Sequence, residues 1–195
     1  MTNVLIVVDV QNDFTEGGSL GVKGGNVTAT SITAYIRAHK SDYSRVIASR
    51  DWHSPDGDNG GHFAAKPDMV TTWPSHCVQG TTGAAYNPGL ESELIDIQIY
   101  KGDGHPAYSA FEGHTPGGAS LHDVLRKAKA DHLDIVGIAT DHCVRATALD
   151  AIAKGYTVTV LADLCVGVAP VTTIAAVAEM SAAGVNIRFS SHHES

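Results

Sequence analysis

Apolar residues occur along this chain in short continuous runs rather than in strict alternation with polar ones. The first run, residues 4–8, reads VLIVV and ends at Asp9. Continuous runs rich in β-branched residues are typical of strands that are buried on both faces. Four further runs of this kind and a weaker fifth are also predicted to be strands: residues 45–49, 95–100, 133–138, 156–161 and, more weakly, 185–189.

Segments of helical length separate most of these runs. Strands that alternate with helices form βαβ crossovers, which build a parallel sheet with helices on both faces. The predicted fold class is therefore α/β, with three layers (α/β/α) around a six-stranded, mostly parallel, Rossmann-like sheet. The predicted helices are residues 26–40, 119–130, 142–154 and 170–183.

The stretch from about residue 51 to residue 88 interrupts the alternation of strands and helices. It contains four prolines and many glycines, and connections of this length are usually either functional or disordered. Aromatic side chains favour an ordered loop because they can pack against the rest of the fold. We therefore expect one domain, residues 1–195, with an ordered and functional insertion at about 51–88. The aromatic residues of the insertion are Trp52, Phe63, Trp73 and Tyr86.

The composition of the chain limits the kinds of molecule that the protein is expected to bind. The chain has 195 residues and a net charge of -8, which disfavours nucleic acid because phosphate binding requires clustered Lys and Arg. No apolar run approaches the roughly 20 residues needed to cross a bilayer, and the N-terminal residues do not resemble a signal peptide. Three cysteines cannot all pair, which favours a reducing compartment. We expect a cytoplasmic protein that binds neither nucleic acid nor membrane, and a homo-oligomer is left open.

Polar and charged residues follow several of the predicted strands. They are Asp9, Asp51, Lys101, the segment 140–143 and Asp163. In open parallel sheets the ligand crevice lies outside the carboxyl ends of the strands. We therefore expect these residues at one edge of the sheet.

Cys143 lies where a predicted strand gives way to a predicted helix. A helix N-terminus and a nearby cation lower the pKa of a thiol, which favours thiolate at neutral pH. With Asp9 as general base and Lys101 as the cation, this thiol would be a nucleophile. Each residue taken alone has an ordinary structural alternative. Cys143 could be a small buried hydrophobe, Asp9 could cap a turn, and Lys101 could be a solvated charge at the end of a strand. Cys165 is expected to be a packing residue, and so is Cys77, although its place after His76 leaves a ligand role as the alternative.

Carboxylate and imidazole groups in the insertion are candidate metal ligands. Asp51 and His53 are two residues apart, so on an extended segment their side chains project to the same side. With His62 and His76 they form a mixed oxygen and nitrogen set suited to one divalent Zn, Fe or Mn ion per subunit. The remaining histidines, His142 among them, are expected at the surface or behind the site.

Six motifs in the chain, from the first predicted strand onward, resemble those of bacterial nicotinamidases/pyrazinamidases, a group within the isochorismatase-like cysteine hydrolases. The ATDHCV and WPSHC pieces are the most specific. The resemblance covers most of the chain, up to Asp163. The motifs are VVDVQNDF (7–14), RDWH (50–53), WPSHCVQGT (73–81), YKG (100–102), YSAFEG (108–113) and GIATDHCVRATALDA (137–151).

The resemblance implies a catalytic triad of Asp9, Lys101 and Cys143. The Cys143 thiolate would attack the amide carbonyl of nicotinamide, with the oxyanion held by the backbone N–H groups of Ala139 and Cys143. Ammonia would leave, and water activated by Asp9 would hydrolyse the thioester to nicotinic acid, a step of NAD salvage. Pyrazinamide is also an expected substrate. The peptide between Ile138 and Ala139 is expected to be cis.

The resemblance also implies a metal ion that holds the pyridine nitrogen of the substrate, with water completing its shell. Eight residues separate His53 from His62, a spacing that differs from some relatives and makes His62 the least regular ligand. The implied ligands are Asp51, His53, His62 and His76. Phe14 and Trp73 match positions that sandwich the substrate ring, and Tyr108 lies near the pocket. The alternatives are hydrolysis of another small amide or of a vinyl ether such as isochorismate, and ligand binding without turnover.

Overall fold

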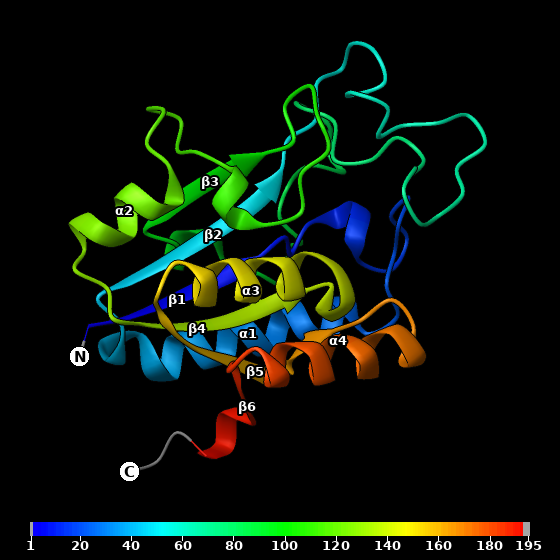
Figure 1. Cartoon of the computed structure of the whole chain (residues 1–195). Coiled ribbons are helices and arrows are strands. Elements are labelled where there is room, and N and C mark those ends of the chain that lie inside the picture. The colour runs from blue at the N-terminus through cyan, green and yellow to red at the C-terminus, as the bar shows by residue number, and fades with distance from the viewer. Residues whose placement is uncertain (1, 193–195) are drawn as a thin grey trace.

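The computed structural model describes residues 2–192 and contains a six-stranded sheet in which every pair of neighbouring strands is parallel (Figure 1). The order across the sheet is β3-β2-β1-β4-β5-β6. The predicted α/β fold is therefore confirmed. The strands are β1 (Asn3–Val8), β2 (Arg45–Asp51), β3 (Ile97–Lys101), β4 (His132–Ile138), β5 (Thr157–Val166) and β6 (Asn186–Arg188).

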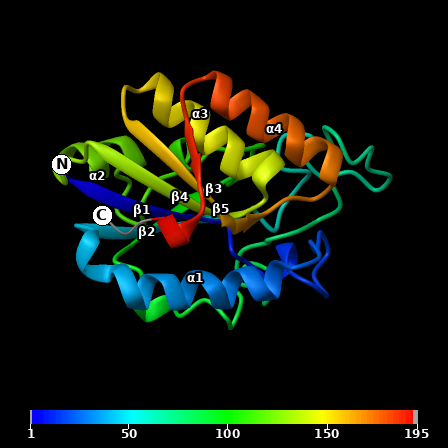
Figure 2. The same ribbon diagram turned by 90° about the horizontal axis from the view of Figure 1, so that it is seen from below.

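Helices cover both faces of the sheet and complete the three layers (Figure 2). One face packs against α1 (Gly25–His39), and the other packs against α2 (Leu121–Lys127), α3 (Arg145–Ala153) and α4 (Pro170–Ala182). No helix within residues 2–192 is long and apolar enough to cross a membrane.

The central strand β1 explains why the apolar runs are continuous. Val4, Ile6 and Val8 belong to the core beneath α2, α3 and α4, whereas Leu5 and Val7 belong to the core beneath α1. All five are fully buried. Each such side chain stabilises the fold by roughly 1.5–3 kcal/mol relative to an exposed one, so both faces of β1 require apolar residues.

The strand order reverses direction between β1 and β4, which lie side by side at the centre of the sheet with Val8 paired to Gly137. Ligands in open α/β sheets bind outside the carboxyl ends of the strands at such a switch point. Asp9 directly follows β1, and Cys143 follows β4 after four residues. The topology therefore brings these two residues to the same crevice.

Strand β5 is longer than expected. It continues to Val166 rather than ending near residue 161, and the register shifts between Ile135 and Gly137 of the neighbouring strand. Asp163 consequently lies inside the strand, where its carboxylate accepts hydrogen bonds of 2.7 and 2.5 Å from the backbone N–H and hydroxyl of Ser190. The expectation that Asp163 faces the crevice was wrong.

The long connection between β2 and β3 lies beyond the carboxyl ends of these strands (Figure 1). Residues 52–91 form turns and isolated bridges, among them His53 with Val78 and Phe63 with Trp73. Three-residue 3₁₀ turns lie at Asn12–Phe14, Lys40–Asp42, Ser92–Leu94, Ala110–Glu112 and Ser190–His192.

Candidate active site

Lys101 lies at the centre of a buried cluster of charged groups. Its Nζ atom is 2.9 Å from Oδ2 of Asp9 and 3.7 Å from Sγ of Cys143, and it also donates to Oδ1 of Asp51. Lys101 and Asp51 end neighbouring strands and are paired in register. The structure thus brings together the three predicted catalytic residues and adds Asp51 as a second partner of the lysine.

Asp9 is held by its neighbour on β2. The residue has a left-handed backbone, with φ of 48°, a conformation that Asp tolerates better than most residues. Its N–H donates to the carbonyl of Ser49 at 3.3 Å, and the Ser49 hydroxyl donates to Oδ1 of Asp9 at 2.7 Å. The carboxylate is therefore oriented between a hydroxyl and the Lys101 ammonium.

Cys143 lies in a π turn, Thr140–Val144, that joins β4 to α3. The carbonyl oxygen of Ala139 accepts hydrogen bonds from the residues on either side of the cysteine, His142 at 3.0 Å and Val144 at 3.1 Å. The peptide between Ile138 and Ala139 is cis, as expected. Turns of this kind are frequent at functional sites.

Asp141 fixes this turn against the start of α4. Its carboxylate accepts hydrogen bonds from the N–H groups of Val168 at 2.9 Å and Ala169 at 3.3 Å, and from the Thr172 hydroxyl. Burial alone would raise the pKa of Asp141, but these hydrogen bonds lower it below its ordinary value. The cysteine turn is therefore tied to a second helix.

Burial raises the pKa of the Cys143 thiol well above its ordinary value. The Lys101 cation opposes this effect, but the carboxylates of Asp9 and Asp51 add to it. The expectation of a resting thiolate was therefore wrong, because the pKa depends on burial and on two nearby carboxylates as well as on the cation. The Lys101 ammonium lies 3.7 Å from Sγ of Cys143 and 2.9 Å from Oδ2 of Asp9, which places the Asp9 carboxylate beside the thiol.

The pKa values of Asp9 and Lys101, the two charged neighbours of Cys143, are both raised. Burial raises the pKa of Asp9, and the Asp51 carboxylate adds to this effect while Lys101 opposes it. Burial alone would lower the pKa of Lys101, but Asp51 and Asp9 raise it well above its ordinary value. Lys101 therefore remains a cation, and Asp9 has the character of a base stronger than an exposed aspartate.

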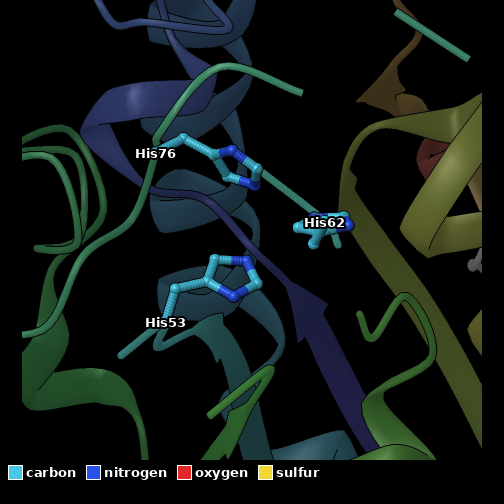
Figure 3. Close-up of side chains that lie close together, drawn as sticks. All are labelled: His53, His62 and His76. Atoms are coloured by element: carbon cyan, nitrogen blue, oxygen red, sulfur yellow. The ribbon is translucent and has the colours of Figure 1, made fainter. Parts of the chain in front are cut away.

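Three imidazole rings converge beside this cluster (Figure 3). His53, His62 and His76 are buried and offer ring nitrogens that all lie within 4.8 Å of one another. Nδ1 of His53 lies 2.7 Å from the carbonyl oxygen of Gly102, and Nδ1 of His76 lies 2.8 Å from that of Pro74. These contacts fix the ring orientations and leave Nε2 of both rings available to a ligand.

The donor groups fit a divalent metal ion. Nε2 of His53 and Nδ1 of His62 are buried and have no hydrogen-bond partner within residues 2–192, an arrangement that costs about 1–3 kcal/mol per group unless a ligand satisfies it. Oδ2 of Asp51 lies 3.6 Å from Nε2 of His53 and 3.7 Å from Nε2 of His76. Mixed imidazole and carboxylate sets bind Zn, Fe or Mn.

The charge state of His62 also suits a ligand. Burial, together with the neighbouring His53 and His76, lowers the pKa of His62 to about 4. Its imidazole is therefore neutral near pH 7, as metal coordination requires. Burial alone would raise the pKa of Asp51, but the Lys101 cation and the neighbouring His53 and His76 rings lower it well below its ordinary value, so Asp51 is ionised.

A cavity of about 260 Å³ opens onto the Cys143 thiol and onto His62 and His76. The predicted ring-binding residues Phe14, Trp73 and Tyr108 all line it, and the indole N–H of Trp73 donates to the Tyr108 hydroxyl at 3.0 Å. Of the predicted catalytic and metal-binding residues, the cavity wall includes Asp51, His62, His76, Ala139 and Cys143. Asp9, His53 and Lys101 are fully or almost fully buried and lie behind this wall.

Several residues of the site were not predicted, and His142 and Gln11 are two of them. His142 lines the cavity with its ring centre 5.4 Å from that of Trp73, so its expected place at the surface or behind the site was wrong; its position next to Cys143 was the available signal. Gln11 is fully buried, and its side-chain amide forms two hydrogen bonds with the backbone of Asp51. It accepts from the Asp51 N–H at 2.8 Å and donates to the Asp51 carbonyl at 2.9 Å. No spacing rule identifies such a contact between side chain and backbone.

Comparison with known proteins places this site in a family. Residues 3–190 match the isochorismatase domain model. The chain is similar to a nicotinamidase/pyrazinamidase of Mycobacterium tuberculosis, with 49% identity over 96% of this chain and 98% of the relative. It is also similar to a nicotinamidase of Escherichia coli, with 39% identity over 94% and 92% of the two chains.

Solved structures agree with these similarities. A pyrazinamidase of Pyrococcus horikoshii in complex with zinc superposes with a TM-score of 0.81 and 36% identity, covering 97% of this chain and 99% of the other. PnC1 from L. infantum in complex with nicotinate gives a TM-score of 0.82 and 36% identity, covering 97% and 93%. This chain therefore belongs to the isochorismatase domain family.

Proposed function

We propose that this protein is a nicotinamidase/pyrazinamidase, which hydrolyses nicotinamide to nicotinic acid and ammonia and also acts on pyrazinamide. The observation that carries this conclusion is a single cavity that reaches both the Cys143 thiol and His62 and His76 of the histidine cluster. Cys143 faces the cavity with Lys101 at 3.7 Å behind it. The similarity to the Mycobacterium tuberculosis enzyme over 96% of this chain supports the same activity.

The first half of the reaction forms a thioester. Asp9 takes the proton of the Cys143 thiol as sulfur attacks the amide carbonyl and a C–S bond forms. The backbone N–H groups of Ala139 and Cys143 stabilise the oxyanion, an interaction that contributes on the order of 10² to 10³ in rate per donor in such sites. The C–N bond then breaks, and the leaving nitrogen receives the proton from Asp9 and departs as ammonia.

The second half releases the acid. Asp9, again ionised, removes a proton from water, and the resulting hydroxide attacks the thioester carbonyl. The C–S bond breaks, nicotinic acid leaves, and the proton held by Asp9 returns to the sulfur of Cys143. Lys101 remains positively charged throughout and stabilises the anionic forms of both groups.

The substrate ring is held by the aromatic wall and the histidine site. Phe14, Trp73 and Tyr108 provide the wall. One divalent ion of Zn, Fe or Mn, when bound, supplies a Lewis acid for the pyridine nitrogen. We assign it to Asp51, His53, His62 and His76. This demand for a ring nitrogen favours nicotinamide over a vinyl ether such as isochorismate, which has none.

Release of ammonia tests this function. The zinc-loaded protein is assayed on nicotinamide, on pyrazinamide and on benzamide, which keeps the ring and the amide but lacks the ring nitrogen. We expect turnover of the first two and much slower turnover of benzamide. Absence of ammonia from nicotinamide would overturn the proposed activity. Equal kcat/KM for nicotinamide and benzamide would overturn only the role given to the ring nitrogen.

We further infer that residues 1–195 act as one domain with the insertion at about 51–88. The binding partner that we propose for this domain is its small-molecule substrate, nicotinamide. A cytoplasmic location is supported by three cysteines that are all free, since disulfides are rare in reducing compartments.

A further inference from the structure

The loop that carries His62 toward the other histidines loses much conformational entropy when it becomes ordered. Eight residues separate His53 from His62, and the last three of them, Asn59, Gly60 and Gly61, are consecutive left-handed positions with φ of 50°, 69° and 82°. Glycine loses more conformational entropy on ordering than any other residue. His62 is nevertheless 2% exposed, so other contacts must hold this loop in place.

Asn59 supplies those contacts. The residue is 2% exposed. Its Oδ1 accepts hydrogen bonds from the N–H groups of Ser54 at 2.9 Å and Gly104 at 3.1 Å, and its Nδ2 donates to the carbonyl of Ser54 at 3.0 Å. Its own carbonyl accepts from the N–H of His62 at 3.3 Å.

These hydrogen bonds connect three segments that shape the histidine cluster. Ser54 directly follows His53, and His62 lies three residues after Asn59. Gly104 lies two residues after Gly102, whose carbonyl oxygen is the 2.7 Å partner of His53 Nδ1. A single buried amide therefore joins the residue after His53 and the segment that contacts His53 Nδ1 to the backbone that presents His62.

We infer that Asn59 is a positioning residue for the histidine site, which sets the separation of His53 and His62 before an ion binds. The inference rests on the proposed function only in assigning these histidines to a divalent ion. Asparagine meets both requirements of the position. It tolerates a left-handed backbone, and its amide offers an acceptor and a donor together.

The test compares zinc binding by the wild-type chain and N59G. Glycine keeps the left-handed backbone at no steric cost, so N59G removes the side-chain hydrogen bonds without straining the backbone. The dissociation constant for Zn²⁺ is measured on the metal-stripped full-length chain by competition with a chromophoric chelator. We expect it to rise about 10- to 100-fold, as for other residues that orient metal ligands. At saturating zinc, kcat on nicotinamide should return close to the wild-type value.

A matched control separates positioning from a general loss of stability. Asn87 is also buried, and its side chain bonds to Thr15, Asn26 and the N–H of Gly89, none of which belongs to the histidine site. N87A should lower the unfolding temperature while leaving the zinc dissociation constant unchanged. N59A removes the same hydrogen bonds as N59G and serves in its place should N59G not fold.

The possible outcomes separate the role of Asn59 from the existence of the metal site. Stoichiometric zinc binding by the wild type with an unchanged dissociation constant in N59G would overturn the role of Asn59 alone. Equal weakening by N59G and N87A would also overturn it, because the effect would then reflect stability. Failure of the wild type to bind zinc would overturn the metal site itself and this inference with it.

Discussion

The hydroxyl of Ser49 donates a hydrogen bond of 2.7 Å to Oδ1 of Asp9. Both side chains are buried, Ser49 on β2 and Asp9 directly after the neighbouring β1, and the other oxygen of Asp9 faces the Lys101 ammonium at 2.9 Å. Burial raises the pKa of Asp9, whereas Lys101 and the Ser49 hydroxyl lower it. Ser49 thus helps to set the pH at which Asp9 can act as a base.

Removing the Ser49 hydroxyl should shift the pH dependence of the reaction. Asp9 must be ionised to accept the thiol proton, so activity falls as pH drops through its pKa. In S49A the carboxylate loses a donor and its pKa rises further. A hydrogen bond to a charged group contributes about 1.5–3 kcal/mol, so the acidic limb of kcat/KM should move to higher pH by about one to two units.

The control for this experiment is S49T, which keeps the hydroxyl on a strand residue. Its acidic limb should lie close to that of the wild type. An acidic limb that stays in place in S49A, or that moves to lower pH, would show that Asp9 is not the base that limits the reaction.

Replacing Lys101 should destabilise the fold. K101M leaves the buried carboxylates of Asp9 and Asp51 without their shared cation, and breaking a buried ion pair in this way costs about 3–5 kcal/mol. Lys40 provides a surface comparison, because its Nζ lies 2.9 Å from Asp96 while the two side chains are 39% and 34% exposed. K40M should change the free energy of unfolding by roughly 0–1 kcal/mol.

Urea denaturation of the metal-free proteins measures both changes, since a bound metal would itself alter the charge at Asp51. Similar losses of stability in K101M and K40M would contradict the buried charge cluster described above.

Acid should destabilise the metal-free protein partly through His62. Its pKa is about 4 when folded, lowered chiefly by burial, against an ordinary value of 6.5. Between these values the unfolded chain binds more protons than the folded one, so stability present above pH 6.5 is lost as pH falls toward 4. H62Q lacks this group, and its unfolding temperature should therefore fall less between pH 7 and pH 5 than that of the wild type.

Differential scanning calorimetry of the metal-free proteins at the two pH values checks this expectation. Equal decreases in unfolding temperature for the wild type and H62Q would mean that His62 is not held neutral by its surroundings.

The positions of the strands could be predicted because burial on both faces requires a continuous apolar run, as in residues 4–8. Once Asp9, Lys101 and Cys143 follow parallel strands, their meeting at one edge of the sheet follows from topology. The end of β5 could not be found in this way. Asp163 interrupts the apolar run although the strand continues to Val166, because an exposed position in an outer part of the sheet accepts a polar residue.

Contacts that orient the site were not predictable for a different reason. Gln11 and Asn59 act on backbone groups distant in sequence, and no periodicity or spacing records such pairs. The pKa of Cys143 was predicted in the wrong direction for a related reason. A cation beside a thiol can be inferred from strand ends, whereas complete burial beside the carboxylates of Asp9 and Asp51 requires the packed structure.

The central claim is that the Cys143 thiol performs the hydrolysis. The most direct test is the rate of ammonia release from nicotinamide by zinc-loaded C143A, beside C165A as a control that alters a thiol elsewhere in the chain. C143A should retain its fold and its zinc and lose at least about 10³ in kcat, while C165A keeps a rate near that of the wild type. A folded, zinc-loaded C143A that releases ammonia at a rate comparable to the wild type would contradict the account.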